Sequence, residues 1–318
     1  MNKPTLVLAG AAIMAKNTRD SISKSFKVIE IPAINDKFKS PDSPFILWCS
    51  LDSKISLEFF DDSGIPTYIV TSTTGITHFQ LEFLSKYENR IIRLERNDKG
   101  LDEVSSTAEF AWALFMQMHM KLIEVQQEVQ NGRWSRWEHY RHQISSLTIG
   151  ILGFGRLGEI TSRFASSFGA SIRVWDIDQS RMDLARKLYP GSTVKSLTEL
   201  LEVSDVVFIH ATEQKDRSSV ITDDLLEKVE SSFGLVNTAR GSLVNEEAVA
   251  KWVINGKIKY YCADVLSEEY GEWNASPLVR LSCEYTNIVI TPHVGGASFQ
   301  AAERIENILL EKLLYRLR

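Results

Sequence analysis

Three glycines, Gly153, Gly155 and Gly158, stand in the spacing G-x-G-x-x-G, and Asp176 follows them about 20 residues later. Between a strand and a helix, such glycines permit a tight turn, the approach of a pyrophosphate to the backbone and close packing of the helix on the strand. A carboxylate at Asp176 can accept hydrogen bonds from both hydroxyls of an adenosine ribose, and it repels a 2′-phosphate. These residues therefore predict a site for NAD rather than NADP; the alternative is that the glycines only mark turns.

The elements around the glycines have the order that dinucleotide binding requires. Thr148–Leu152 is a short apolar run rich in β-branched residues, which indicates a buried strand. Ile160, Phe164 and Phe168 then recur at helical spacing, and a second apolar strand ends at Asp176. The N-terminus of the intervening helix offers N–H groups and a partial positive charge to phosphates.

Further along the chain, three segments each end an expected strand with polar residues. They are Val236–Gly241, Ala263–Glu269 and Val289–Gly296. In doubly wound sheets, ligands bind at the carboxyl ends of the strands. We therefore expect the chemistry to lie in these three segments.

Alternating strands and helices are expected on both sides of the glycine turn, which predicts parallel sheets. The candidate strands are Thr5–Ala9, Phe26–Ile31, Phe45–Cys49, Thr67–Thr71, Val206–Ala211, Gly234–Asn237, Tyr260–Val265 and Ile288–Thr291. One long helix is expected from about Glu103 to Gln130, and a last helix from Phe299 to Leu314. The aromatic and basic stretch Arg133–His142 is either a surface loop or an interface element, and we favour the interface because exposed tryptophans tend to mark contacts.

The composition limits the possible classes of protein. The chain has 318 residues, 44% of them hydrophobic and 24% charged, which suits a soluble protein of two domains. A net charge of −5 without a basic block argues against nucleic acid as a partner. Three distant cysteines without metal-ligand spacing indicate reduced thiols in the cytoplasm and no metal site.

The N-terminal segment allows two interpretations. Lys3 followed by Leu6 to Ala15 has the charge, length and small residues of a minimal signal peptide, whereas Thr5–Ala9 can also be the first strand of a sheet. We favour the strand, because cleavage would remove a core element. No apolar run approaches the length of a membrane span.

The ordered motifs resemble those of the D-isomer-specific 2-hydroxyacid dehydrogenase family, which contains phosphoglycerate, glycerate and D-lactate dehydrogenases. The likeness extends over roughly Pro66 to Arg304. The motifs that carry it are Ser106-Thr-Ala-Glu109, the glycine turn, Asp205-Val-Val-Phe-Ile-His210, Asn237-Thr-Ala-Arg-Gly241, Ala263-Asp-Val265 and Thr291-Pro-His-Val-Gly-Gly296.

The resemblance implies three catalytic residues. Arg240 would hold the substrate carboxylate and polarise the carbonyl that accepts the hydride, for which a planar guanidinium suits better than lysine. His293 would donate a proton on reduction and remove it on oxidation. Glu269 would pair with the far nitrogen of His293 and favour the imidazolium form.

The resemblance also implies binding residues for the cofactor and the substrate. Thr74 and Gly75, together with Arg240 and His293, would contact the substrate. The cofactor residues would be Thr107, Gly153, Gly155, Arg156, Leu157, Gly158, Asp176, His210, Ala211, Thr212, Thr238, Ala239, Arg240, Asp264, His293 and Gly296. His210 can equally be a packed residue at a strand end.

The chain departs from the family pattern beside the expected catalytic carboxylate. The family usually has proline after this glutamate, and this chain has Tyr270. Glu268 is adjacent, so the sequence leaves open whether Glu268 or Glu269 pairs with His293.

We therefore expect an α/β protein with two doubly wound parallel-sheet domains. A Rossmann NAD domain, residues 101–291, is inserted into a flavodoxin-like substrate domain made of residues 1–100 and 292–318. The expected activity is NAD-dependent hydride transfer between NAD(H) and a small D-2-hydroxy or 2-keto acid, by a homodimer without metal, membrane or nucleic-acid partners. The alternatives are a non-catalytic NAD(H)-sensing scaffold and a dehydrogenase of another small anion.

Overall fold

The computed structural model describes residues 3–10, 14–32, 41, 44–49, 55–60, 64–76, 78–213 and 218–318. The chain divides into two compact units. Unit 1 comprises Met1–Val104 and Ala297–Arg318, and unit 2 comprises Ser105–Gly296. The unit boundaries thus fall a few residues later in the chain than the sequence suggests.

Unit 1 contains one parallel sheet with the strand order β2-β1-β3-β4-β5. This is the flavodoxin-like order, in which the chain reverses its direction of winding beside the first strand. Its regular elements are β1 (Thr5–Ala9), α1 (Lys16–Ser25), β2 (Lys27–Ile31), β3 (Phe45–Cys49), β4 (Tyr68–Thr71), α2 (Leu81–Tyr87), β5 (Ile91–Ile92) and α11 (Phe299–Arg316), with 3₁₀ turns at Leu57–Phe59, Glu88–Arg90 and Leu101–Glu103.

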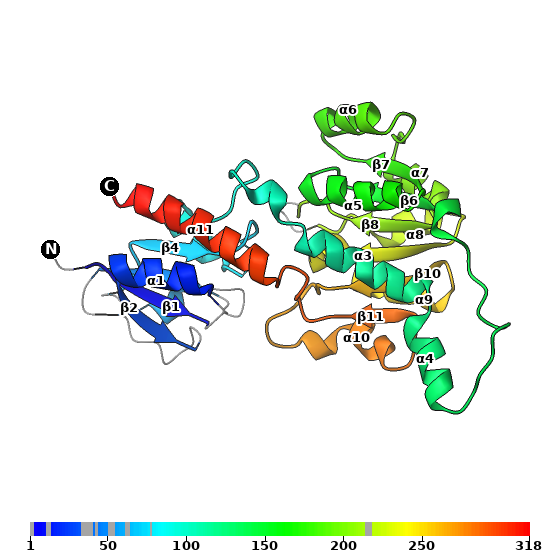
Figure 1. Cartoon of the computed structure of the whole chain (residues 1–318), viewed down its shortest axis with the longest axis horizontal. Helices are drawn as coiled ribbons and strands as arrows, with labels where there is room; N and C mark the ends of the chain where they lie inside the picture. The colour runs from blue at the N-terminus through cyan, green and yellow to red at the C-terminus, as the bar shows by residue number, and fades with distance from the viewer. Residues whose placement is uncertain are drawn as a thin grey trace. The chain divides into compact units, whose positions relative to one another are not determined.

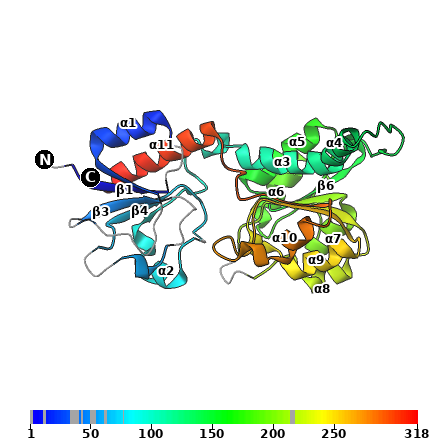
Figure 2. The same ribbon diagram turned by 90° about the horizontal axis from the view of Figure 1, so that it is seen from below.

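Helices cover both faces of this sheet, with α1 and α11 on one face and α2 on the other (Figures 1 and 2). Successive residues of β1 supply the two cores, because side chains of a strand alternate between its faces. Leu6 and Leu8 pack under α1 and α11, whereas Val7 and Ala9 pack toward α2. The C-terminal helix therefore completes the core of the N-terminal sheet.

Unit 2 contains a larger parallel sheet between two layers of helices. Its regular elements are α3 (Ser106–His119), α4 (Leu122–Gln130), β6 (Thr148–Leu152), α5 (Arg156–Ser167), β7 (Ser171–Trp175), α6 (Gln179–Leu188), α7 (Leu197–Val203), β8 (Val206–Ile209), α8 (Asp223–Lys228), β9 (Phe233–Asn237), α9 (Glu246–Ile254), β10 (Ile258–Ala263), α10 (Pro277–Ser282) and β11 (Ile288–Ile290), with 3₁₀ turns at Ile144–Ser146, Gly241–Leu243 and Trp273–Ala275.

The strand order of this sheet is β11-β10-β9-β8-β6-β7. A parallel bridge between Val174 and Thr193 adds a single residue pair beyond β7. Thr193 therefore takes the place of the third strand in a Rossmann sheet, whose full order is 3-2-1-4-5-6. The predicted fold class is confirmed, with this edge strand reduced to one bridge.

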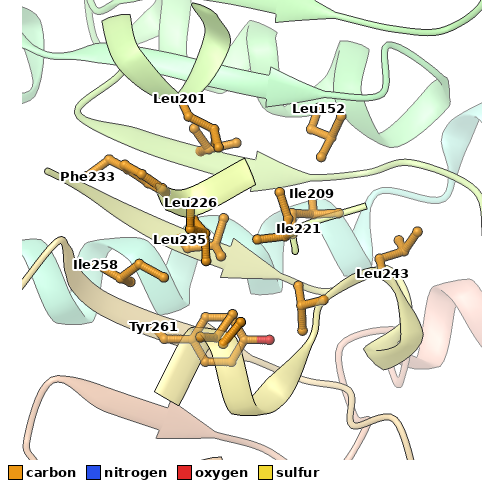
Figure 3. Packing of buried hydrophobic residues seen from close by; sticks show 14 of the residues in the cluster. Leu152, Leu201, Ile209, Ile221, Leu226, Phe233, Leu235, Leu243, Ile258 and Tyr261 are labelled. Carbon is orange, nitrogen blue, oxygen red and sulfur yellow. The ribbon is translucent and has the colours of Figure 1, made fainter. Parts of the chain in front are cut away.

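Two apolar cores enclose the larger sheet. One lies between the sheet and α3, α5 and α6, and the other between the sheet and α7, α8, α9 and α10. Figure 3 shows the second core, where Ile209, Leu235 and Tyr261 from the strands meet Leu201 and Leu226 from the helices. These cores fix the strands whose carboxyl ends carry the polar residues discussed below.

The expected single helix from Glu103 to Gln130 is wrong. The structure has two helices, α3 and α4, because Lys121 adopts a left-handed backbone with φ of 53°. A left-handed residue cannot continue a right-handed helix. The two helices also differ in burial, since α3 carries five buried residues and α4 carries none.

The other predicted elements differ from the structure by one to two residues at their ends. Thr5–Ala9, Phe45–Cys49 and Thr148–Leu152 have their predicted bounds, and β1 lies in the core of unit 1. Residues 11–13 of the segment with two interpretations lie outside the described residues. None of the helices in the described ranges has the length and apolar character needed to cross a membrane.

One buried carboxylate connects the C-terminal helix α11 to the backbone just before α1. Glu306 of α11 is 5% exposed and accepts a hydrogen bond of 2.9 Å from the backbone N–H of Ala15, just before α1. Burial raises the pKa of Glu306 above its ordinary value of 4.5, and the bonds from Ala15 and Thr18 only partly oppose this shift.

This raised pKa gives a testable effect of pH on stability. A carboxyl whose pKa is raised in the folded state stabilises the fold when protonated, and this contribution is lost as the pH rises through the raised pKa. The side chain of Glu306→Gln stays neutral at every pH. We therefore expect the Tm of the variant, minus that of the wild type, to be larger at neutral than at mildly acidic pH. Thermal unfolding at both pH values measures this, with the exposed Glu311→Gln on the same helix as control. A difference in Tm that does not change with pH would contradict the expectation.

Candidate active site

The glycine turn joins β6 to α5 in a conformation that side chains would obstruct. Gly153 has a φ of 93°, and a Cβ there would lie 2.6 Å from the backbone nitrogen of Ala211. A Cβ on Gly158 would overlap the carbonyl oxygen of Gly153. Gly155 is the N-cap residue of α5, in extended conformation. Tight contact between turn, helix and neighbouring strand thus requires glycine at both Gly153 and Gly158.

Helix α5 begins at Arg156, and Leu157 is its second residue. Among the described residues, no side chain caps this helix end. Helix N-termini left without a side-chain cap bind anions through their N–H groups and the helix dipole. The backbone here can therefore accept the pyrophosphate of a dinucleotide.

Asp176 follows β7 directly and faces the glycine turn. Its Oδ2 accepts a hydrogen bond of 2.7 Å from the N–H of Phe154, and its Oδ1 accepts one of 2.8 Å from the N–H of Asp178. Each carboxylate oxygen can accept a second hydrogen bond. The side chain is therefore oriented by the backbone and retains acceptor capacity for ribose hydroxyls.

Two buried polar atoms fit a bound dinucleotide. Nδ1 of His210, directly after β8, and Oγ1 of Thr238, directly after β9, are buried without a hydrogen-bond partner in the described part of the chain. Buried polar groups normally have partners. The hydroxyl and amide groups of NAD are of the kind that would satisfy both atoms.

His210 is held in its neutral form. Its Nε2 lies 2.8 Å from Oγ1 of Thr161, and its ring stacks near Phe208. Burial lowers the pKa of His210 to about 3, and the nearby charge of Arg156 adds to this shift. At neutral pH the ring is thus an uncharged hydrogen-bonding group.

The remaining cofactor candidates also lie at carboxyl ends of strands or at the start of α3. Ala211 is partly exposed, Thr212 is exposed and Ala239 is buried. Thr107 and Gly296 are neighbours, because a Cβ on Gly296 would lie 3.7 Å from Oγ1 of Thr107. The structure thus places Thr107, in α3, beside the end of the His293 segment.

The loop that carries Arg240 is held by a fully buried asparagine. Asn237, the last residue of β9, donates from Nδ2 to the carbonyl of Arg240 at 2.9 Å and accepts from the N–H of Ala239 at 3.1 Å. Arg240 donates from Nη1 to the carbonyl of Ala239 at 2.6 Å. A Cβ on the following Gly241 would overlap the backbone of Leu266, so this loop packs directly on the loop after β10.

Asp264 holds the segment that carries His293. Its carboxylate is 2% exposed and accepts hydrogen bonds from Oγ1 of Thr291 at 2.6 Å, from the N–H of Val294 at 3.0 Å and from that of Gly295 at 2.6 Å. His293 itself has a φ of 55°, which is uncommon for a residue other than glycine. The bonds to Asp264 on both sides of His293 fix it in this conformation.

Glu269 is the carboxylate that pairs with His293. Nδ1 of His293 lies 2.8 Å from Oε2 of Glu269, and the two side chains are 27% and 24% exposed. Oε1 of Glu269 accepts a hydrogen bond of 3.1 Å from the N–H of Leu266. Because Nδ1 is engaged, Nε2 is the ring nitrogen that remains for a substrate.

Glu268 has a different partner. Its Oε1 accepts a hydrogen bond of 3.0 Å from the N–H of Tyr270. A proline at this position would have no N–H to donate. The residue that departs from the family pattern therefore engages Glu268, and this resolves the choice that the sequence leaves open.

The two candidates in unit 1 lie in the loop after β4. Thr74 is exposed, and the carbonyl of Gly75 accepts a hydrogen bond of 2.5 Å from Oγ1 of Thr73. Oγ1 of Thr73 also lies 3.2 Å from Oγ1 of Thr71, which contacts the buried His78 at 3.0 Å. A set of hydroxyl groups thus orders this loop.

Sequence reasoning missed the supporting role of Asn237. The only available signal was a polar residue at the end of an apolar strand, three positions before the arginine.

Within the described ranges, no group of three or more His, Cys, Asp or Glu side chains could hold a metal ion.

Comparisons with known proteins agree with the geometry of unit 2. Residues 112–295 match the family model described as D-isomer specific 2-hydroxyacid dehydrogenase, NAD binding domain. The chain is 32% identical to a glyoxylate reductase of Thermococcus gammatolerans over 98% of this chain and 92% of that protein. It is 33% identical to a glyoxylate reductase of Thermococcus kodakarensis over 83% and 77% of the two chains. A D-lactate dehydrogenase from Aquifex aeolicus, solved with NAD and lactic acid, shares the fold with a TM-score of 0.80 at 21% identity, over 98% and 95% of the chains.

The contact between Gly241 and Leu266 can be tested by stability. We expect Gly241→Ala to destabilise unit 2 by about 1–3 kcal/mol, the usual cost of overpacking, because the added methyl overlaps backbone that cannot move like a side chain. Urea unfolding measures the change. Gly296→Ala is the matched control, since its Cβ would make only an ordinary contact. Equal stability of the two variants would contradict this assignment.

Proposed function

Because the chain belongs to the D-isomer-specific 2-hydroxyacid dehydrogenase family, we propose that His293, Glu269 and Arg240 catalyse its reaction, the transfer of a hydride between NAD(H) and a small 2-keto or 2-hydroxy acid. The predicted family, the NAD cofactor and NAD-dependent oxidoreduction of hydroxy and keto acids are confirmed by the family match and the named relatives. The roles of individual residues are the proposal. The contact of 2.8 Å between Nδ1 of His293 and Glu269 carries it.

His293 is the proton donor in this proposal. When bound, NADH would supply the hydride for the carbonyl carbon. Nε2 of His293 donates a proton to the oxygen of the developing alkoxide and takes it back when the reaction runs in reverse. Glu269 holds the ring through Nδ1 and favours the protonated ring that donates the proton.

Arg240 binds the substrate anion. Its guanidinium can form two parallel hydrogen bonds to a carboxylate, which orients a 2-keto acid and polarises its carbonyl group. Thr74, which is exposed, and Gly75 stay predictions for substrate binding that rest on the family resemblance. Asp176 would accept from the adenosine ribose and so favour NADH over NADPH, and His210 and Thr238 would contact other parts of the cofactor.

We propose glyoxylate and 2-keto acids of similar size as the substrates. Two relatives that are at least 32% identical to this chain are named glyoxylate reductases. The cytoplasm is the proposed location, because the reaction draws on a pool of NAD(H).

The assigned roles can be tested by turnover. We expect the purified protein to oxidise NADH with glyoxylate or another member of a panel of 2-keto acids, and to use NADPH less well. His293→Ala should lower kcat by about 10²–10⁴-fold, the usual worth of general acid–base catalysis. Binding of NADH, followed by its fluorescence, should persist in the variant.

Two outcomes would contradict these roles. Full activity of His293→Ala would place the proton donor elsewhere. NADH binding without turnover on any acid of the panel would favour the alternative of a sensing scaffold. Glu284→Ala is the control, since Glu284 is exposed in unit 2 and lies outside both the proposed site and the proposed dimer contact.

We further propose that the chain forms a homodimer through unit 2. The segment of residues 133–142, called the arm below, exposes Trp134, Trp137 and Tyr140 by 74–80%. The apolar side chains Leu122, Ile123 and Val129 of α4 are also about half exposed. Large exposed apolar surfaces with aromatic residues are typical of protein interfaces.

The arm is ordered although its aromatic side chains face solvent. His139 lies 2.8 Å from the carboxylate of Glu128 on α4, and Nε2 of His119 on α3 lies 2.8 Å from the carbonyl of His142. Figure 1 shows α4 and the arm extending from the body of unit 2. A second copy of the chain is the occupant that the family's usual dimeric state favours.

The dimer can be tested by removing the aromatic anchors. We expect the double variant Trp134→Ser, Trp137→Ser to be monomeric at concentrations where the wild type is dimeric, because interface energy is concentrated in such residues. Light scattering after size exclusion measures the mass. Trp273→Ser, at a tryptophan that is 52% exposed elsewhere in unit 2, should stay dimeric. A monomeric wild type would rule the proposal out.

A further inference from the structure

The loop between β10 and α10, residues 264–276, carries Glu269 and is called the carboxylate loop here. A side chain from outside this loop binds it at two points. Glu246, at the start of α9, accepts a hydrogen bond of 2.7 Å at Oε1 from the N–H of Ser267. Its Oε2 accepts one of 2.6 Å from Oγ of Ser276. One carboxylate thus links two residues that are nine positions apart.

The first of these bonds lies next to the catalytic pair. Ser267 follows Leu266, whose N–H donates to Oε1 of Glu269. The other oxygen of Glu269 contacts Nδ1 of His293. Glu246 therefore fixes the backbone that in turn orients Glu269, and within the described residues no hydrogen bond or ion pair joins Glu246 to His293 itself.

We propose that Glu246 is a positioning residue for the pair of Glu269 and His293. The inference rests on the proposed roles of that pair. Hydrogen bonds to a charged carboxylate are stronger than neutral ones, and here two of them connect the carboxylate loop to α9, at Ser267 and at Ser276. When both are lost, Glu269 spends less time against the ring, and the imidazolium loses part of its stabilisation.

The two carboxylates that contact His293 or its backbone neighbours both come from the loop after β10. Glu269 contacts its Nδ1, and Asp264 accepts from the backbone of the next two residues. Glu246 orients Glu269 indirectly, through the backbone of the carboxylate loop. Its neighbour Glu247 also lies in the first turn of α9, so both glutamates interact similarly with the helix dipole, but Glu247 is exposed.

Variants at the two neighbouring glutamates separate positioning from a general effect on α9. We expect Glu246→Ala to lower kcat about tenfold, the equivalent of one charge-assisted hydrogen bond. The alkaline limb of its pH–rate profile should move to lower pH, while NADH binding stays as in the wild type. Glu246→Gln, whose amide can still accept from Ser267 and donate to Ser276, should restore most of the activity. Glu247→Ala should match the wild type.

Several results would overturn the proposal. These are a wild-type pH profile in a folded Glu246→Ala variant, or equal losses in Glu246→Ala and Glu247→Ala. If Glu246→Ala does not fold, Ser276→Ala removes one of the two bonds and should shift the limb in the same direction by less; an unmoved limb there overturns the proposal too.

His293→Ala distinguishes this inference from the function on which it rests. An alkaline limb that disappears in His293→Ala assigns the limb to that residue, and the Glu246 series then tests positioning alone. A limb that persists in His293→Ala overturns both the proposed roles and the positioning of Glu246.

Discussion

The buried carboxylate of Asp264 is the interaction on which the active-site geometry depends. It accepts three hydrogen bonds from one short segment and receives them on both sides of His293. A left-handed residue other than glycine costs about 1–2 kcal/mol, so the conformation persists only where the surroundings enforce it. The backbone N–H of Asp264 also donates to the carbonyl of Asn237, which joins this segment to the loop of Arg240.

The parallel sheet brings these loops together. Five strand ends of unit 2 lie along one edge, and each is followed by a turn or residue with a proposed role: the glycine turn after β6, His210 after β8, Arg240 after β9, Glu269 after β10 and His293 after β11. Their separation in sequence is large, but neighbouring strands of a sheet are only about 5 Å apart. Loop-to-loop contacts, such as Gly241 against Leu266, then set the finer geometry.

Much of this arrangement could be predicted from the sequence, because the signals were local. Thr148–Leu152 has its predicted bounds since an apolar run ends at a glycine. Arg240 and His293 lie in motifs whose spacing identifies the family. The break at Lys121 has no such signal, because the flanking residues favour helix on both sides and only the backbone conformation separates them.

Other features depend on contacts between distant residues. The choice between Glu268 and Glu269 follows from the hydrogen bonds of one loop, and no periodicity or composition encodes it. The two-residue strand Ile91–Ile92 and the bridge at Thr193 are too short to leave a pattern. Asn237 and Glu246 are polar residues with supporting contacts, and only the folded chain reveals their partners.

The neutral state of His210 has a consequence for how the protein responds to acidity. Its ring becomes protonated only at a pH far below that of any cell interior, because burial lowers its pKa to about 3. The ring of His210 therefore stays uncharged at the pH of any cell interior, whereas the side chain of His293 is 27% exposed. The two histidines thus lie in different surroundings: the ring of His210 is enclosed and close to the charge of Arg156, and that of His293 is paired with Glu269 and partly open to solvent.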